Sequence, residues 1–526
     1  MNDKTIPIVL GVSGHLTIRE EDREPLKHAV AKVIATLRAR CPATDLVMLN
    51  SLAAGADLLC ADVAQSMDVP LIAALPLSRA DFETDFDEAT LARFRMHCDN
   101  AIDCYTVPAI EPLPETPSRD FAYRQAGIHV ATFAHVLIAL WDGEDPTPHG
   151  CGTSSAVDFA LHGSYRPAIG AAIDASQAVY HIYTPRGDRA DAPAGTTRFL
   201  GDEQRFDELL ARTDEFNRLA RQTEPAAYPI LETDGSDATL ERIKTVHAVA
   251  ETLSNANGER YRRILALLAA MSTAVTIAFL LYDEVELHWM ILVCGIVLLG
   301  AFLLSRLAAR LACHRRYIEY RMLEESLRVQ AYLRYAGSTV QPAALLSWTQ
   351  KEEAGWVAAA LAALGLAGPA KESHSIRDCW IEGQRRYHAA AGKKAQKRQR
   401  TSERIVRTAL WISVTVYLVS LLFEVVNGLF RLLPTVDAEL YRTTIKILLG
   451  SVSAATLFVS NYYGKLSLSR KVGDHSKMER FFAEMTRRLA EQGQTDELLA
   501  HTAHEELIEN GNWCSYQRDN TPDFNL

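Results

Sequence analysis

The sequence has few cysteines and no pairing pattern among them. Its nine cysteines include no Cys-x-x-Cys pair and no regular ladder. A zinc site and a disulfide framework are therefore not expected, and neither is any other metal site. We expect reduced thiols that face the cytosol or lie in a membrane.

An excess of basic residues and an apolar N-terminal leader are also missing. The net charge is -10 and the pI is about 5.9, which argues against nucleic acid as a main partner. Because no apolar signal peptide occupies the N-terminus, residues 1 to about 260 are expected to stay in the cytoplasm.

Long apolar runs are abundant, but only in the second half of the chain. A chain of 526 residues predicts two to four domains, and its mean hydropathy of -0.05 averages a polar first half with four apolar segments. A segment of 19 apolar residues extends about 28 Å as a helix, close to the hydrocarbon thickness of a bilayer. The four segments are Ile264–Tyr282, Leu287–Ser305, Thr408–Phe430 and Thr443–Tyr463. Their arrangement as two hairpins favours four transmembrane helices over buried core helices.

Basic residues flank one end of each hairpin. They are Arg262, Arg263, Arg306, Arg310, Arg315, Arg316, Lys393, Lys394, Lys397, Arg398, Arg400, Arg404, Arg407, Lys465, Arg470 and Lys471. The opposite loops hold Asp283, Glu284, Glu286, Asp437 and Glu439, with Arg431 and Arg442 as minority cations. The positive-inside rule therefore predicts that both termini and residues 306–407 are cytosolic. The basic run 393–407 is read as this topology signal, with anionic lipid binding as the alternative.

Two ionisable residues, Glu424 and Lys446, lie inside the apolar spans. A charge in hydrocarbon costs at least a few kcal/mol unless it is paired, reaches the interface or faces water. Both are expected at similar depth towards the outer leaflet. In the structural interpretation they form a salt bridge that closes the hairpin, or their side chains reach the interface. In the functional interpretation they line the outer mouth of a water-filled path between subunits.

A helix with an apolar stripe follows each hairpin. The first stripe is predicted at Tyr320, Leu323, Leu327 and Ala331, and the second at Met478, Phe482, Met485 and Leu489. Each stripe must be buried against the other unit or against a neighbouring subunit.

Residues 6 to 185 alternate strand-length apolar runs with helix-patterned stretches. The predicted strands are Ile6–Leu10, Leu46–Leu49, Pro70–Leu77, Ala101–Val107, Val136–Trp141 and Val179–Tyr183. Pro25–Arg38 and Gly55–Met67 are among the predicted helices. This order predicts a Rossmann-like, doubly wound α/β fold with a parallel sheet.

Three glycine-bearing turns are predicted just past strands, at the carboxyl edge where such sheets bind ligands. They hold the first group of candidate ligand residues: Gly11, Ser13, Gly14, Gly55, Asp57, Gly150, Gly152 and Thr153. Each turn leads into a helix N-terminus, whose N–H groups favour phosphate. A tight turn without a ligand is the alternative for each glycine.

Four further residues are candidates for contacts with a nucleotide. His15 is suited to stack on a base or donate to phosphate. Asp57, already in the first group, is suited to accept ribose hydroxyls unless it caps a helix. Tyr123 and Arg124 face the pocket from an adjoining helix or are solvated, and Asp142 is a further polar candidate.

The stretches "GVSGH", "SLAAGAD" and "LIALWDG…GCGTSSAV" resemble the SLOG superfamily of Rossmann-like domains. The tandem hairpins with their trailing helices, including "EELIENGNWCSYQRD", look like SLATT domains, two-span membrane modules that accompany SLOG sensors in bacterial conflict systems. The resemblance implies a nucleotide sensor fused to a membrane effector of antiviral defence in the bacterial inner membrane. It also implies a homo-oligomer and a messenger such as a cyclic oligonucleotide or an ADP-ribose derivative.

An enzyme is the alternative, since related phosphoribohydrolases carry a GGxGTxxE signature with a catalytic glutamate. Here the glutamate position is Ala156, and Pro148-His149-Gly150-Cys151 replaces the first glycine pair. An alanine cannot perform acid–base catalysis at an N-glycosidic bond, so binding without turnover is favoured. Asp57, Asp142 and Arg124 remain as groups that would support a hydrolase.

The predicted organisation has four parts. They are a SLOG-like domain (1–200), a helical connector (201–257), a first two-span unit with its cytosolic helix (258–380) and a second two-span unit with C-terminal helices (381–526).

Overall fold

A computed structural model of the chain describes most residues in two compact units. The described residues are 2–111, 113–115, 117–144, 150–163, 178–186, 192–225, 230–370, 372–430, 435–465 and 468–519. Of the residues named above, Pro148, His149 and Arg431 lie outside them, as do the side chains of Asp437 and Lys465. Unit 1 comprises Met1–Leu253, Glu319–Ile376 and Gln494–Cys514, and unit 2 comprises Ser254–Ile318, Arg377–Gly493 and Ser515–Leu526.

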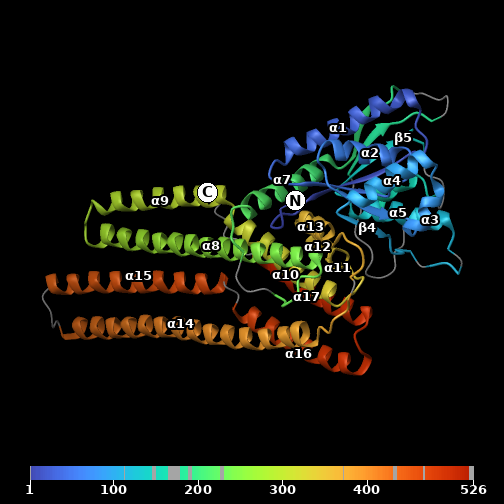
Figure 1. Ribbon diagram of the computed structural model, residues 1–526. Coiled ribbons are helices and arrows are strands. Elements are labelled where there is room, and N and C mark those ends of the chain that lie inside the picture. The colour runs from blue at the N-terminus through green and yellow to red at the C-terminus, as the bar shows by residue number, and fades with distance from the viewer. Residues whose placement is uncertain are drawn as a thin grey trace. The chain divides into compact units, whose positions relative to one another are not determined.

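A seven-stranded sheet forms the centre of unit 1 (Figure 1). Its strands are β1 (Ile8–Gly14), β2 (Leu46–Asn50), β3 (Leu71–Leu75), β4 (Asp103–Thr106), β5 (Val136–Trp141), β6 (Ala178–Tyr183) and β7 (Thr197–Gly201). The order is β4-β3-β2-β1-β5-β6-β7, and only the β6–β7 pair is antiparallel. The Rossmann-like α/β prediction and its six strands are confirmed. The seventh strand was missed because β7 is a short, half-exposed edge strand without an apolar run.

Helices cover both faces of this sheet. One face carries α1 (Arg23–Arg40), α2 (Ala56–Ser66) and α4 (Glu88–Asn100), which share a buried core with alternate strand residues such as Leu10 and Ile138. On the other face lie α5 (Arg119–Phe133) and α6 (Thr153–His162). The short elements η1 (Glu20–Asp22), α3 (Arg79–Phe82) and η2 (Glu83–Asp85) complete this part of the unit.

The first glycine stretch is strand, not turn. β1 continues through Gly14, so the prediction of a turn at Gly11–His15 is wrong. A Cβ atom on Gly11 would lie 2.6 Å from the Cβ of Ala134, and one on Gly14 would lie 2.3 Å from the Cβ of Ala56. The two glycines therefore let α5 and α2 approach the sheet, which is a packing role that a glycine also plays in dinucleotide-binding folds.

The remaining helices of unit 1 come from distant parts of the chain. They are α7 (Glu203–Ala220), the start of α8 (Ala238–Glu284), α10 (Cys313–Tyr335), α11 (Pro342–Leu345), α12 (Trp348–Glu353), α13 (Gly355–Gly365) and α17 (Asp496–Asp519). The first predicted stripe is buried, and the ring of Tyr320 packs 5.4 Å from Phe216 and 6.2 Å from Trp356. The stripe thus packs within unit 1, next to α7 and α13.

Unit 2 consists of long helices. They are the remainder of α8, α9 (Met290–Leu311), α14 (Glu382–Phe430) preceded by the π-helical turn η3 (Arg377–Ile381), α15 (Thr435–Lys465) and α16 (Leu468–Gln492). α16 packs on α14 through Met478, Phe482 and Met485, so most of the second predicted stripe is also buried, with Leu489 half-buried.

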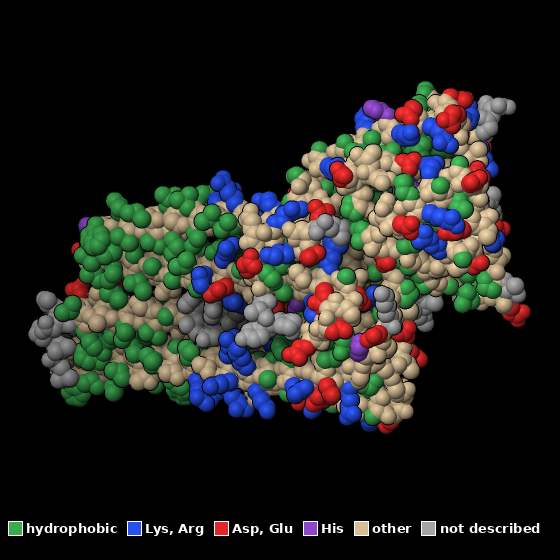
Figure 2. Space-filling model, viewed as in Figure 1, with side chains coloured by type: hydrophobic (Ala, Val, Ile, Leu, Met, Phe, Trp, Pro, Cys, Tyr) green, Lys and Arg blue, Asp and Glu red, His purple; other side chains and the backbone are tan. Residues whose placement is uncertain are grey.

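Hydrophobic side chains cover the exposed surface of these helices, and Lys and Arg gather where this surface ends (Figure 2). Exposed members include Leu267, Leu292, Leu299, Leu303, Leu410, Trp411, Leu418 and Leu422. So large an apolar surface indicates contact with lipid. Three described helices, Ala238–Glu284, Met290–Tyr335 and Arg377–Phe430, are long and apolar enough to cross a membrane. α15 occupies the fourth predicted segment as a helix, but the side chains of 457–465 are outside the described residues, and the fourth span stays a prediction.

Candidate functional site

The strand order places a topological switch point between β1 and β5. The chain leaves β1 towards β2 on one side, and β5 adds on the other side. Doubly wound sheets bind ligands beyond the carboxyl ends of the two strands at such a point. The residues that directly follow these strands are His15 and Asp142. Both are candidates from the sequence, and the fold brings them together.

The imidazole of His15 bridges the two strand ends. Its Nε2 accepts a hydrogen bond from the backbone N–H of Asp142 at 3.2 Å and lies 3.5 Å from the Asp142 carboxylate. Burial lowers the pKa of His15, which the Asp142 carboxylate partly opposes. A neutral imidazole that accepts at Nε2 carries its proton on Nδ1, so His15 has a donor left for a ligand. Beside it, the side chain of Leu16 is two-thirds exposed and offers an apolar surface.

The second glycine turn is folded against the first strand. Gly55 has a φ of +77°, and a Cβ atom there would lie 2.3 Å from the carbonyl oxygen of Leu16. The N–H of Ala56, the first residue of α2, donates to the His15 carbonyl at 3.0 Å. This N–H group is therefore already used within the protein.

Asp57 lies in the interior of the same turn. Its side chain accepts from the N–H of Ala53 at 3.3 Å, and burial raises its pKa to about 7. Asp57 thus contacts the turn that precedes α2, and it does not cap the helix, because the N-cap residue is Gly55 and no side chain caps it. Sequence reasoning missed Asn50, which is fully buried, donates to the Asp57 carbonyl at 2.8 Å and accepts from the N–H of Leu52 at 2.7 Å. Its position at the end of β2 was the available signal.

In the described part of the third glycine turn, residues 150–152, no side chain caps the following helix. Gly152 is the N-cap of α6 and provides no side-chain cap. A Cβ atom on Gly152 would meet nothing within 4 Å among the described residues. The first N–H groups of an α-helix have no partner within the helix, and they attract anions. Thr153, the next residue, is buried.

Arg124 joins α5 to this helix start. Its Nη1 donates to the carbonyl of Gly150 at 3.2 Å, and its guanidinium lies 4.7 Å from the centre of the Phe159 ring on α6. Glu111, which the sequence did not single out, accepts from Arg124 Nε at 2.9 Å and from Nη2 at 3.1 Å. Arg124 is therefore positioned beside the open turn, with its charge paired.

Tyr123 is directed elsewhere. It is one residue away from Arg124 on α5, but its hydroxyl donates to Asp85, and its ring lies 6.1 Å from Phe82. Neighbouring residues on a helix point about 100° apart, which explains the separation. Tyr123 is thus not brought to the α6 turn.

Ala156 faces the interior between two helices. It is buried, and the Cβ position of Gly127 on α5 is 3.8 Å from the Ala156 methyl group. Asp158 is turned away and pairs with His162 at 3.0 Å. No described group of three or more His, Cys, Asp or Glu residues is arranged to hold a metal ion.

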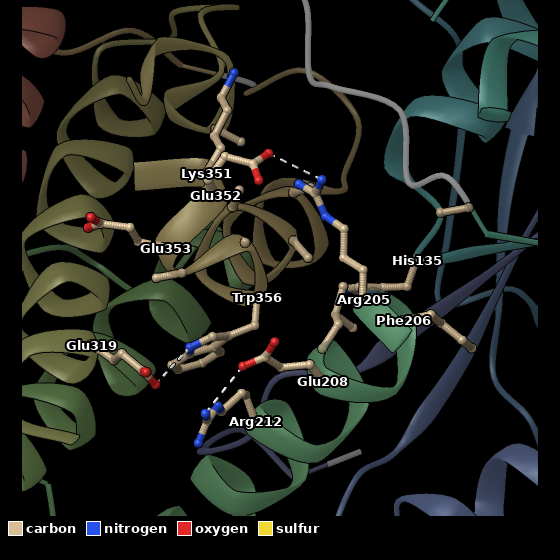
Figure 3. Close-up of a pocket in the computed structure, with 18 of the residues that line it drawn as sticks. His135, Arg205, Phe206, Glu208, Arg212, Glu319, Lys351, Glu352, Glu353 and Trp356 are labelled. Atoms are coloured by element: carbon tan, nitrogen blue, oxygen red, sulfur yellow. Dashed lines mark hydrogen bonds and ion pairs between the residues drawn. The ribbon is translucent and has the colours of Figure 1, made fainter. Parts of the chain in front are cut away.

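Two cavities of unit 1 lie at the amino edge of the sheet, away from the candidates. The smaller, about 160 Å³, lies between α7 and α12–α13 near His135, which precedes β5 (Figure 3). Its charged side chains pair with one another: Arg205 with Glu352 at 3.3 Å, and Arg212 with Glu208 at 3.2 Å. These pairs are structural contacts between or within helices.

The larger cavity, about 910 Å³, extends from Pro7 and Asp103 at the strand starts to the beginning of α8 and to Arg334. Arg334 donates to Asp237 at 2.6 Å and to the Gly368 carbonyl at 2.6 Å. Neither cavity is lined by a predicted ligand residue. Carboxyl-edge geometry, rather than cavity size, therefore identifies the candidate site.

Glu424 and Lys446, two ionisable residues within the predicted spans, pair with other residues and not with each other. Glu424 on α14 accepts from Arg442 on α15 through two bonds of 2.6 and 2.7 Å, and Lys446 lies 2.9 Å from Glu284 on α8. The expected Glu424–Lys446 bridge is not formed, because Lys446 lies one helical turn beyond Arg442. The first pair closes the second hairpin, and the other pair joins the two hairpins.

No model of a known protein family matches the chain, and no curated protein matches it in sequence.

Proposed function

We propose that this protein is a membrane effector whose α/β domain binds a phosphorylated nucleotide at the β1–β5 switch point. The observation that carries the proposal is the convergence of His15, Asp142 and the uncapped start of α6 at the edge where doubly wound sheets bind ligands. The helix start attracts phosphate, while His15 and Leu16 provide a donor and an apolar surface for a base.

The proposed ligand is a messenger such as a cyclic oligonucleotide or an ADP-ribose derivative, bound without turnover. The alternative is an enzyme that hydrolyses an N-glycosidic bond, and it requires an acid–base residue where the chain has Ala156. The burial of Ala156 against α5 supports binding over hydrolysis.

The proposed output is permeation of the bacterial inner membrane by a homo-oligomer, as in antiviral defence. The apolar helices of unit 2 support a membrane role. α8 is a single helix that contains both a segment of unit 1 and the first apolar span, which makes it a direct covalent route for coupling. The ligand shifts the oligomer only if it binds the open arrangement more tightly than the closed one.

The binding test uses the full-length protein in lipid nanodiscs. It is incubated with nucleoside monophosphates, NAD, ADP-ribose and cyclic dinucleotides, and bound and free compounds are identified by mass analysis. We expect at least one compound to be retained unchanged, with affinity about tenfold lower in His15→Ala, the loss of roughly one charge-assisted hydrogen bond. His28→Ala, an exposed histidine on α1, is the matched control and should bind normally.

Release of a free base over many turnovers would instead establish the enzyme. Retention of none of these compounds would refute the sensor. In liposomes, the retained compound should also trigger ion flux that His15→Ala reduces.

A further inference from the structure

Unit 1 contains a second cluster of titratable groups, far along the chain from the switch point. Three helices contribute to it, and all of its members belong to unit 1. They are His247 and Glu251 on α8, Arg321, Glu324, Glu325 and Arg328 on α10, and Glu506 and Glu509 on α17. We call Glu251, Glu324, Glu325, Glu506 and Glu509 the carboxyl cluster.

Three members of the carboxyl cluster are buried, and Glu251 and Glu509 are half-buried. Glu324, Glu325 and Glu506 are each no more than 6% exposed. Arg328 lies 2.6 Å from Glu506 and also contacts Glu325, whereas Arg321 contacts Glu325 and lies 3.3 Å from Glu324. Among the described contacts, two guanidinium groups thus pair with three of the carboxyl groups, Glu324, Glu325 and Glu506. Charges buried without full pairing are costly, and protonation removes that cost.

The neighbouring His247 does not supply positive charge. Burial lowers the pKa of His247 to about 3, so its imidazole is neutral, and Nε2 forms no hydrogen bond within the described residues. The phenol of Tyr332 also lies near Arg328. One oxygen of Glu324, Oε2, is also buried without a partner among the described residues.

Two members of the carboxyl cluster have a raised pKa. Burial raises the pKa of Glu324 to about 7, with Glu325 and Glu251 adding to the shift against Arg321 and Arg328. Burial, followed by the charge of Glu325, raises the pKa of Glu509 to about 7 as well. Both groups lie outside the apolar spans, on α10 and α17.

We propose that the carboxyl cluster is a proton-binding site, at which Glu324 and Glu509 hold protons while α17 packs on α10. Separation of the helices returns each carboxyl group to water and releases its proton. The folded pKa is raised above the ordinary value, so the packed state binds more protons between about pH 4.5 and 7. Packing is strongest below that window and weakens as the pH rises through it.

The test is hydrogen exchange of the α17 amides in the full-length protein in nanodiscs, between about pH 5 and 7.5. The opening constant is obtained by dividing each rate by the intrinsic exchange rate at that pH. In the wild type it should rise by up to about tenfold per pH unit for each of the two carboxyl groups. The double variant Glu324→Gln/Glu509→Gln should abolish this dependence on pH. Each single variant should halve the slope of the logarithm of the opening constant against pH.

Glu497→Gln, an exposed glutamate on α17, is the matched control and should keep the wild-type slope. A wild-type opening constant that does not change with pH, or a double variant that keeps the slope, would overturn the proposal. Should the double variant fail to fold, infrared spectra decide. At about pH 6 the wild type should show an infrared band of protonated carboxyl groups, and Glu509→Gln should weaken this band. An unchanged band would also overturn the proposal.

Discussion

Gly14 and Gly152, two glycines at the carboxyl edge, differ in how closely other atoms approach them. Gly14 is packed so closely that an added Cβ atom would also lie 2.9 Å from the Cβ of Leu140, whereas one on Gly152 would meet nothing within 4 Å among the described residues. Neither residue has a positive φ. Packing therefore explains Gly14 without a ligand, while Gly152 keeps the approach to α6 open.

We predict that Gly14→Ala destabilises the protein by about 1–3 kcal/mol, because β1, β5 and α2 must move apart to admit the methyl group. For a domain of this size, that change lowers the thermal midpoint by several degrees, roughly 2–4 °C for each kcal/mol. The measurement is thermal unfolding of the full-length protein in detergent, followed by tryptophan fluorescence. Gly152→Ala, the matched control, should leave the midpoint within about a degree. Equal midpoints for the two variants would contradict the packing explanation.

At the same scale, the sequence predicted which residues lie at the carboxyl edge better than it predicted their contacts. His15 and Asp142 meet because β1 and β5 are neighbours, and that follows from strand order. The burial of Asp57 depends on how the turn 50–57 folds back on Leu16, which no local pattern encodes. The carboxylate of Glu111 that pairs with Arg124 comes from a loop without periodicity.

Among elements, α8 and α15 form the described contact between the two hairpins. Lys446 and Gly450 are one turn apart on α15, and they face Glu284 and Leu280, one turn apart on α8. A Cβ atom on Gly450 would lie 2.6 Å from a methyl group of Leu280. Small residues allow such close approach of helices in membranes. The apolar pattern predicted the helices, but pairing of their charges depends on relative depth and rotation.

We predict that reversing one charge of the Glu284–Lys446 pair disrupts assembly of the hairpins. Glu284→Lys and Lys446→Glu should each lower the amount of monodisperse protein several-fold, because like charges then meet near hydrocarbon. The double variant should recover most of it. The measurement is size-exclusion chromatography of detergent-extracted protein. Glu286→Lys, in the exposed loop beside Glu284, is the control, and failure of the double variant to recover would refute the pairing.

Over the whole molecule, unit 1 is assembled from three separate stretches of chain. Most of α10, which follows the first hairpin, and most of α17, which follows α16, belong to the unit that contains the sheet. The sequence predicted an apolar stripe on α10 and another on α16, and both stripes are largely buried. The expected partners of the stripes were the other two-span unit or a neighbouring subunit, and for α16 this is wrong, because it packs on α14 of its own two-span unit. The α10 stripe packs beside α7 and α13, and contacts over such distances along the chain leave no periodic signal.

The orientation of the whole chain in the membrane can also be tested. We predict that a membrane-impermeant thiol reagent labels Glu286→Cys in intact cells but not Gln396→Cys, since basic residues flank the second position. Both sites are exposed, so in a Cys151→Ser background, which removes the exposed native thiol, both should be labelled once the membrane is permeabilised. Labelling of Gln396→Cys alone would invert the orientation, and labelling of both would exclude a single orientation.

The turn before α6 also carries a natural reporter. All nine cysteines lie within the described part of the chain, and among them Cys151 alone is exposed. It directly precedes Gly152, and its neighbour Gly150 is held by Arg124. Exposure favours reaction of a thiol-reactive dye at this position, while partial burial of the thiol and the charge of Asp120 raise the pKa of Cys151 and slow that reaction. The dye's rate of attachment, and afterwards its emission, will follow occupancy of the turn, so candidate messengers can be screened without an engineered cysteine.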